Sequence, residues 1–375
     1  MNHIALMIPG LDRIGGAERQ VTLLAKGLHN RGWRVSVVAL SGTGGVAAAE
    51  LVDAGVAFLS LHMRKGLADP RGWVRFHRWL TEQVPDIVHA HLSHAAWLAR
   101  WSRLVSPSRA VIDTLHSSST GSLGRQLGYR ISDGLTDQIT AVSQAAANAH
   151  LDANMAANIS VLPNGIDVSL WQPEAHMRQS LRHDLLLEDE FLWFAAGRLE
   201  PVKDYPTLLA AMTQLPKSAQ LVIAGGGPLE SELRQLTSEL GIELRVRFLG
   251  FESDVKRWMQ AADGFVLSSR WEGLPMALLE AAACALPAVA TDVPGTREAI
   301  VDGQTGLLTT PGDPNALAAT MLRMMQGTPD HRRAMGDRAH QRIVDCFSLE
   351  SVLNRWEALY ADLLQRNRRP TRWAQ

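Results

Sequence analysis

Residues 191–227 read FLWFAAGRLEPVKDYPTLLAAMTQLPKSAQLVIAGGG. An apolar run at 191–195 is followed by a polar loop, then by a helix-like stretch at 205–214 and a second apolar run at 220–224. A strand, a helix and a second strand in this order are typical of a parallel sheet that is covered by helices. The stretch therefore predicts an α/β fold.

The same alternation extends in both directions along the chain. It pauses once, in the turn-type residues Pro163-Asn164-Gly165-Ile166-Asp167. We expect two doubly wound, Rossmann-like domains that face each other across a cleft, at 1–168 and 169–348, with the last helix, about 349–375, packing back onto the first domain. The remaining candidate strands lie at 4–8, 35–40, 56–61, 87–90, 110–115, 138–142, 159–162, 246–249, 264–267, 288–290 and 306–308.

Composition narrows the possible functions and locations. The chain has 375 residues, 46% hydrophobic and 20% charged, and a formal net charge of −1, which argues against a general nucleic-acid binder. Its two cysteines suit a reducing compartment. The apolar run at 4–8 is too short for a secretion signal, and no stretch approaches the ~20 apolar residues that span a bilayer. We therefore expect a cytoplasmic protein whose membrane contact, if any, is peripheral.

The strongest motif is the sequence WEGLPMALLE at 271–280. Pro275 fits the first turn of a helix, and the backbone N–H groups of Met276 and Ala277 then point out of the helix and can receive a phosphate. Glu272 before the helix and Glu280 within it can accept hydrogen bonds from vicinal hydroxyls of a sugar or a ribose. From spacing alone, a solvent-facing pair of glutamates explains the pattern equally well.

Two cations follow the strand that ends near residue 196. Arg198 and Lys203 lie on a strand-to-helix loop, where a guanidinium and an ammonium together suit a diphosphate. Isolated surface cations are the plainer alternative. Gly226 and Gly227 follow the next strand and permit close backbone approach to a ligand, although they could form only a tight turn. The backbone near Phe251, at the end of a further strand, could read a nucleobase.

The N-terminal half offers weaker candidates. Gly15 and Gly16 open a long helix and provide a second potential anion site. His116 ends a strand and could face the cleft, or could be structural. His89 and His91 share one face of a strand near His94, but without a nearby carboxylate we do not expect a metal site.

These motifs together resemble the retaining glycosyltransferases of family four, which have the GT-B fold, and the resemblance covers essentially the whole chain. It implies that Arg198 and Lys203 hold the donor diphosphate, helped by Gly16 and the helix after Pro275. Glu280 would bind the ribose, Glu272 the transferred sugar, and His116 would lie near that sugar. The full set of donor-binding residues is expected to be Gly15, Gly16, Arg198, Lys203, Gly226, Gly227, Phe251, Leu274, Met276, Ala277 and Glu280.

The resemblance implies a retaining hexosyltransferase that acts without a cofactor. The chain contains no Asp-x-Asp triplet, so the cations and the helix dipole would replace a metal ion at the diphosphate. Arg198 and Lys203 would stabilise the leaving group during front-face attack. The donor-binding domain would be 169–348, and 1–168 would bind the acceptor. UDP is favoured over GDP, while the donor sugar, the linkage and the oligomeric state stay open.

The expected acceptor is a glycan or a lipid-linked oligosaccharide of bacterial polysaccharide assembly. Arginines and aromatics at 73–79 and 97–103 suit an anionic membrane surface, with a core of aromatics and solvated arginines as an equal alternative. Other possibilities are a small-molecule glycosyltransferase, a sugar-nucleotide epimerase and a non-catalytic protein that binds a sugar nucleotide.

Overall fold

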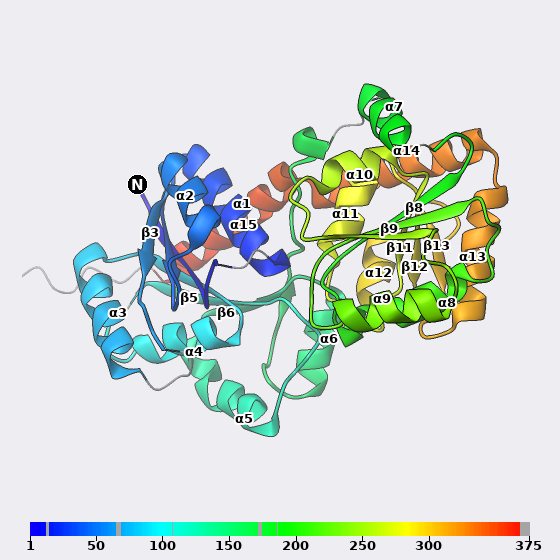
Figure 1. Cartoon of the computed structure of the whole chain (residues 1–375). Helices are drawn as coiled ribbons and strands as arrows, with labels where there is room; N and C mark the ends of the chain where they lie inside the picture. Colours follow the sequence, from blue (N-terminus) through cyan, green and yellow to red (C-terminus); the bar gives the residue numbers. More distant parts are fainter. Residues whose placement is uncertain (13–14, 65–68, 107, 172–174, 186, 368–375) are drawn as a thin grey trace, which may run out of the picture. The chain divides into compact units, whose positions relative to one another are not determined.

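The computed structural model describes residues 1–12, 15–64, 69–106, 108–171, 175–185 and 187–367 (Figure 1). The chain forms two compact units. Among the described residues, one comprises Met1–Gly165 together with 349–367, and the other comprises Ile166–Ser348.

The first unit is built on a parallel sheet of seven strands. Every pair of neighbouring strands in it is parallel. In spatial order the strands are β3 (Ala57–Ser60), β2 (Arg34–Ala39), β1 (His3–Ile8), β4 (Ile87–His91), β5 (Ala110–Leu115), β6 (Gln138–Ala141) and β7 (Ser160–Val161).

Helices cover both faces of this sheet, and β1 shows why. All six of its residues are buried. Ile4, Leu6 and Ile8 belong to one core cluster, while Ala5 and Met7 belong to the cluster on the opposite face, as the alternation of a strand requires. The helices are α1 (Gly16–Asn30), α2 (Gly45–Asp53), α3 (Pro70–Gln83), α4 (Ser93–Ser102), α5 (Leu123–Ser132) with the 3-10 turn η1 (Asp133–Leu135), α6 (Gln144–Asp152) and α15 (Leu349–Arg366).

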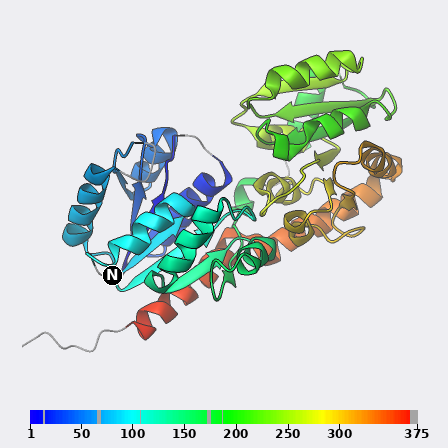
Figure 2. The same cartoon turned by 90° about the horizontal axis from the view of Figure 1, so that it is seen from below.

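The C-terminal helix α15 is part of the first unit. Its Leu353, Trp356 and Tyr360 are buried in the same cluster as Ile4 of β1. The helix packs along α1, and Gly27 of α1 lies so close to it that a Cβ there would come within 2.6 Å of a methyl carbon of Leu353. In both views α15 (red) lies with the blue and cyan elements of this unit (Figures 1 and 2).

The second unit contains a parallel sheet of six strands. In spatial order they are β10 (Val246–Gly250), β9 (Ala219–Ala224), β8 (Phe191–Ala196), β11 (Gly264–Leu267), β12 (Ala288–Thr291) and β13 (Leu307–Thr309). Its helices are η2 (Val168–Trp171), α7 (Ala175–Asp184), η3 (Pro201–Lys203), α8 (Tyr205–Met212), α9 (Glu230–Glu239), α10 (Val255–Ala261), α11 (Met276–Ala283), α12 (Pro294–Ala299), α13 (Pro314–Gln326) and α14 (Pro329–Phe347).

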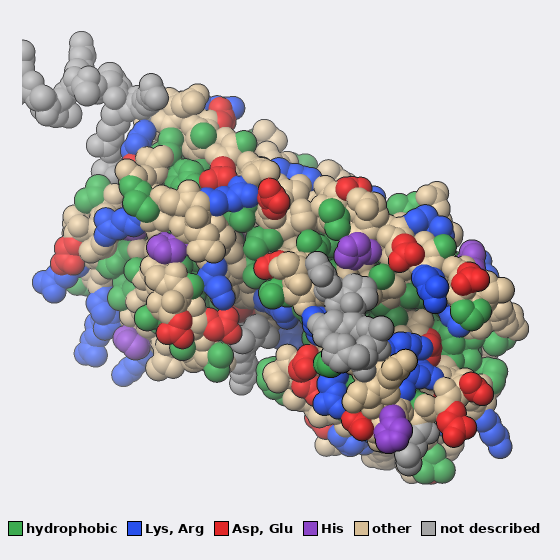
Figure 3. Space-filling view, turned by 90° about the horizontal axis from the view of Figure 1, so that it is seen from above, with side chains coloured by type: hydrophobic (Ala, Val, Ile, Leu, Met, Phe, Trp, Pro, Cys, Tyr) green, Lys and Arg blue, Asp and Glu red, His purple; other side chains and the backbone are tan. Residues whose placement is uncertain are grey.

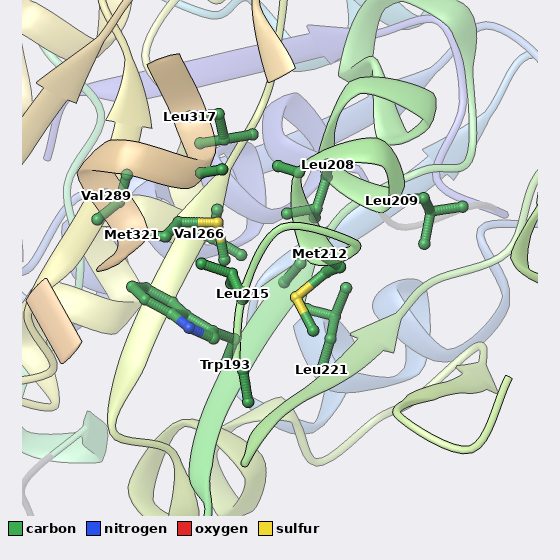
Figure 4. Packing of buried hydrophobic residues seen from close by; sticks show 14 of the residues in the cluster. Trp193, Leu208, Leu209, Met212, Leu215, Leu221, Val266, Val289, Leu317 and Met321 are labelled. Carbon is green, nitrogen blue, oxygen red and sulfur yellow. The ribbon is translucent and has the colours of Figure 1, made fainter. Parts of the chain in front are cut away.

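One face of the second sheet carries a large apolar core. Trp193 of β8 is fully buried there among Leu208 and Met212 of α8 and Leu317 of α13 (Figure 4). Helix α11 does not contribute to this cluster and packs instead against α14. The chain therefore leaves β8 toward one face of the sheet and leaves β11 toward the other.

The two parallel, helix-covered sheets confirm the predicted α/β class, and most predicted elements shift only at their ends. The helix expected to begin near Pro275 is α11, which ends at Ala283. Ala285 has a φ of 55°, in the left-handed region that does not continue a right-handed helix. Pro275 is the residue that caps α11, not part of its first turn as predicted, because its ψ of 109° is extended.

Candidate functional site

The loops after β8 and β11 meet at the carboxyl edge of the second sheet. These strands are neighbours, yet their chains continue to opposite faces, which is the arrangement that creates a ligand crevice in doubly wound folds. Two hydrogen bonds join the loops. The amide of Arg270 donates to the carbonyl oxygen of Val202, and Oγ of Ser268 donates to the carbonyl oxygen of Lys203, each at 2.8 Å.

Lys203 and Glu272 form an ion pair in this crevice. Nζ of Lys203 lies 2.5 Å from Oε1 of Glu272, and Oγ of Ser269 donates to the same oxygen at 2.6 Å. The side chains of Lys203 and Glu272 are only 20% and 11% exposed. Burial and the charge of Glu272 raise the pKa of Tyr205, whose hydroxyl donates to the carbonyl oxygen of Gly197. The structure thus brings together two residues that lie 69 positions apart in the sequence.

Arg198 follows β8 on the same loop, but its environment differs. Its side chain is 74% exposed, and its guanidinium contacts Glu200 at 3.0 Å. An exposed guanidinium retains donors that face solvent, and it can bind an anion without first leaving a buried partner. The two predicted cations are therefore one constrained ammonium and one accessible guanidinium.

The glycines after β9 have different surroundings. A Cβ on Gly225 would lie 2.0 Å from the carbonyl oxygen of Gly197, and a Cβ on Gly227 would lie 2.5 Å from that of Leu199. These two glycines are thus required for the close packing of one loop against the next. A Cβ on Gly226 would meet nothing within 4 Å, so among the described residues this glycine has open space beside it.

The end of β10 adjoins the same glycine loop. The amide of Gly225 donates to the carbonyl oxygen of Gly250 at 2.7 Å. Phe251 comes next, and its side chain is 80% exposed. A large apolar ring held in solvent beside this loop offers a face on which a planar ligand can stack.

Helix α11 begins at the crevice. Met276 and Ala277 are half-buried in its first turn, where backbone N–H groups lack acceptors within the helix. Leu274 is buried on the loop before them, and Glu280 is 5% exposed, one turn further into the helix. A carboxylate at this depth needs hydrogen-bond donors to offset its lost hydration. Glu280 already has an interaction within the protein, and a carboxylate can accept further hydrogen bonds from ligand hydroxyls.

Sequence reasoning missed the residues that hold the Glu272 loop in place. Ser269 donates to Glu272, and Oγ1 of Thr291 donates to the carbonyl oxygen of Ser269 at 2.5 Å. A Cβ on Gly295 would lie 2.3 Å from the carbonyl oxygen of Gly273. Small and hydroxyl residues at or just after the ends of strands β11 and β12 are a signal only once the order of these strands is known.

In the first unit, the ring of His116 forms a hydrogen bond with that of another histidine. Nδ1 of His91 and Nε2 of His116 are 2.9 Å apart, and burial lowers the pKa of His91 well below its usual value and that of His116 to about 4. His89 lies between Oη of Tyr360 at 2.8 Å and Oγ1 of Thr114 at 2.6 Å, and burial lowers its pKa to about 3. All three imidazoles are neutral at pH 7.

His89 and His91 do share one face, with ring centroids 4.2 Å apart. Within the described part of the chain, no group of three or more His, Cys, Asp or Glu residues is arranged to hold a metal ion. None of the described helices combines the length and the hydropathy that a bilayer crossing requires.

The predicted anion site at the start of α1 is partly satisfied by the protein itself. Gly15 caps the helix, and its amide donates to Oε2 of Glu18 at 3.1 Å. An added anion would have to bind beside this carboxylate or displace it, whereas the amide of Gly16 has no such acceptor among the described residues.

The stretch at 97–103 is not the solvent-facing arginine and tryptophan surface that suits a membrane. Arg100 is fully buried and forms an ion pair with Asp113 at 2.9 Å. Arg103 is paired with Asp137. In the neighbouring stretch Phe76 is fully buried as well. On the face shown in Figure 3, basic and acidic side chains are interspersed.

Both halves of the chain match known family models. Residues 14–170 match the model described as Glycosyltransferase Family 4, and residues 177–342 match the model described as Glycosyl transferases group 1. Together these matches extend over both units of the structure.

Similar proteins include bacterial sugar-transferring enzymes. N-acetyl-alpha-D-glucosaminyl L-malate synthase of Bacillus anthracis is 29% identical over 294 residues, 75% of each chain. UDP-Gal:alpha-D-GlcNAc-diphosphoundecaprenol alpha-1,3-galactosyltransferase of Escherichia coli is 25% identical over 318 residues, 80% of this chain and 81% of that one. The crystal structure of Anabaena Alr3699/HepE in complex with UDP-glucose has a TM-score of 0.84 and 23% identity, covering 96% of this chain and 99% of that one. This likeness shows a shared fold and confirms the GT-B prediction.

Proposed function

The chain belongs to the family 4 glycosyltransferases, and we propose that it transfers a hexose-type sugar, with retention, from a UDP-sugar to a glycan or lipid-linked acceptor in bacterial polysaccharide assembly. The observation that carries the proposal is the largely shielded pair of Lys203 and Glu272, together with the exposed guanidinium of Arg198 on the same loop as Lys203. All three side chains follow neighbouring strands of one sheet, at the point where doubly wound folds bind nucleotides.

We assign the donor contacts in the second unit as follows. Arg198 and Lys203 bind the diphosphate, aided by the first amides of α11. Glu280 accepts hydrogen bonds from the ribose hydroxyls, and Glu272 accepts them from the transferred sugar. The exposed ring of Phe251 is assigned to stacking on the base. Gly226 lets the ligand approach closely, because no described atom lies within 4 Å of the position that a Cβ would take there.

The proposed reaction is a front-face displacement. The acceptor hydroxyl oxygen forms a bond to the anomeric carbon on the side from which the phosphate departs, so the configuration is retained. The bond from that carbon to the phosphate oxygen breaks, its electron pair stays on the diphosphate, and the hydroxyl proton moves to a phosphate oxygen. Arg198 and Lys203 stabilise the negative charge that develops on the leaving group, which is the main catalytic contribution.

No metal ion has a role in this mechanism. The sequence lacks the Asp-x-Asp triplet, and the groups at the crevice that suit a diphosphate are cationic side chains and helix amides. Turnover that persists in excess EDTA would support this part of the proposal.

The lipid-linked substrates named for similar enzymes favour an enzyme that works at the cytoplasmic face of a membrane. The exposed side of α3, with Arg75, Arg78 and 66%-exposed Val74, is the candidate contact. Sedimentation with anionic liposomes tests this placement, and an absence of co-sedimentation would remove it.

A UDP-release assay tests the function directly. The full chain is incubated with UDP-glucose, UDP-galactose or UDP-N-acetylglucosamine and a panel of glycan acceptors, in EDTA. Turnover should fall in Lys203→Ala and persist in Lys217→Ala, a control at an exposed lysine of the same unit. If Lys203→Ala kept wild-type turnover at saturating donor, the assignment of Lys203 would fail.

The Bacillus anthracis relative, whose name gives L-malate as acceptor, makes a small-molecule acceptor the second candidate. L-malate and other small hydroxy acids therefore belong in the acceptor panel. UDP release that depends on such a compound and not on any glycan would favour this alternative.

A further inference from the structure

The first unit contains a pocket of about 700 Å³ that none of the assigned residues of the donor site enters. It lies beyond the carboxyl ends of β1 and β2 and is closed on one side by α3 and α4, which contribute Trp73, Trp97 and Trp101. Its volume is within the ~300–1,000 Å³ of typical small-molecule sites. All of the described residues that line it belong to the first unit.

Three half-buried tryptophans give the pocket flat apolar surfaces. Trp73 and Trp97 pack against the core of this unit, so their rings are held in place. Trp97 also covers Gly128 of α5, where an added Cβ would lie 1.9 Å from a ring carbon. The faces of such rings carry partial negative charge and attract the positively polarised C–H groups of a sugar ring.

Two carboxylates supply acceptors at the same pocket. Oδ1 of Asp12 accepts from the amides of Thr43 and Gly44 at 3.0 and 2.8 Å, and these bonds fix its side chain. Oε2 of Glu18 is held by the amide of Gly15 at 3.1 Å. Each carboxylate has a second oxygen, and ionised carboxylate oxygens accept hydrogen bonds from hydroxyl groups.

We propose that this pocket binds a neutral sugar unit of the acceptor, whose C–H face stacks on Trp73 and Trp101 while its hydroxyls donate to Asp12 and Glu18. The inference rests on the proposed function and specifies its acceptor class. An isoprenoid chain would desolvate both carboxylates without giving them donors. Among the described residues that line the pocket, an anionic sugar would meet two carboxylates and one guanidinium, that of Arg64.

Saturation-transfer NMR on the full chain with UDP present tests this inference. The probes are maltose, N,N′-diacetylchitobiose and methyl galactoside as neutral sugars, glucuronic acid as an anionic sugar, and farnesyl phosphate as an isoprenoid. We expect transfer to at least one neutral probe. Its affinity should fall about 10-fold or more in Trp73→Ala and in Trp101→Ala, which corresponds to the loss of one stacking contact.

Trp79→Ala is the matched control, because Trp79 is a half-buried tryptophan on the same helix as Trp73 but does not line the pocket. Trp101→Phe keeps an aromatic face and should restore most of the affinity. The inference is overturned if none of the neutral probes binds, if farnesyl phosphate or glucuronic acid binds in their place, or if Trp79→Ala weakens binding as much as Trp73→Ala. UDP binding is measured in the same samples. An absence of UDP binding would count against the proposed function itself, whereas UDP binding without binding of a neutral sugar would count only against the sugar pocket.

Discussion

Nζ of Lys203 lies 2.5 Å from Oε1 of Glu272, and the two residues follow neighbouring strands whose chains depart to opposite faces of the sheet. This pair neutralises two charges in a crevice where both side chains are largely shielded from water. A diphosphate arriving beside Lys203 would therefore meet an ammonium that is already oriented. Glu272 would remain available to the sugar hydroxyls, which can replace part of its hydrogen bonding.

Removing Lys203 should affect both activity and stability. Lys203→Ala leaves the shielded carboxylate of Glu272 with the hydroxyl of Ser269 as its remaining partner among the described residues, and we expect the unfolding free energy to fall by on the order of 3 kcal/mol. Turnover should fall about 100-fold or more because charge on the leaving group loses its stabilisation. Thermal unfolding and UDP release measure the two effects.

A double variant, Lys203→Met with Glu272→Gln, separates these effects. It removes the unpaired charge, so most of the stability should return while turnover stays low. Wild-type turnover in the double variant would contradict the role of the pair in the reaction.

Arg198 should affect binding without affecting stability. Its side chain is 74% exposed, so Arg198→Ala should leave the melting temperature unchanged. The substitution should weaken UDP affinity about 10-fold, because a charge-assisted contact is lost. Arg257→Ala is the control, because the side chain of Arg257 is 43% exposed and is also paired with a carboxylate in the same unit. Isothermal titration measures the affinities, and equal affinity in wild type and Arg198→Ala would count against the assignment.

Two adjacent glycines should respond differently to the same substitution. Gly227→Ala places a methyl group 2.5 Å from the carbonyl oxygen of Leu199 and should lower the melting temperature, since backbone must move. Gly226→Ala meets nothing within 4 Å and should fold normally, yet bind UDP less well if the nucleotide approaches there. Normal UDP affinity in Gly226→Ala would remove Gly226 from the donor site.

The buried histidines should make the protein less stable in mild acid. Burial lowers the pKa of His89 to about 3 and of His116 to about 4, so both stay neutral in the folded state while the unfolded chain takes up protons below about pH 6.5. Their stabilising contribution is complete above that pH and is lost as the pH falls toward 4. Each such histidine contributes a slope of about 1.4 kcal/mol per pH unit.

Melting temperatures between pH 8 and pH 5 test this prediction. His89→Gln should be less stable at pH 8 because it changes the bonds to Tyr360 and Thr114, and its melting temperature should depend less on pH. A wild-type melting temperature that rises on acidification would contradict the assignment of neutral imidazoles.

The sequence predicted the meeting of the loops after β8 and β11 better than it predicted the first unit. Lys203 and Glu272 each follow an apolar strand, and parallel strands end at one edge, so their proximity could be expected once those strands were identified. The support from Ser269 and Gly295 could not be expected, because it depends on strand order and on the path of two loops.

Arg100 shows a limit of pattern reading in the first unit. Its spacing beside Trp97 and Trp101 suggested a surface, whereas its partner Asp113 lies on a different element, β5. A long-range ion pair leaves no local signature in the sequence. The pocket lined by the tryptophans of this stretch could not be predicted either. Its other walls are the loops after β1 and β2, which come from distant parts of the chain.

The central claim is that side-chain cations hold a donor diphosphate without a metal ion, and titration calorimetry of UDP in excess EDTA tests it most directly. The wild-type chain should bind UDP under these conditions. The double variant Lys203→Ala/Arg198→Ala should lose about 100-fold or more in affinity for UDP, because two charge-assisted contacts are removed. The affinity for uridine, which is weaker than that for UDP in the wild-type chain, should stay unchanged. UDP binding that requires added Mg²⁺, or equal UDP affinity in the wild-type and double-variant proteins, would contradict this account.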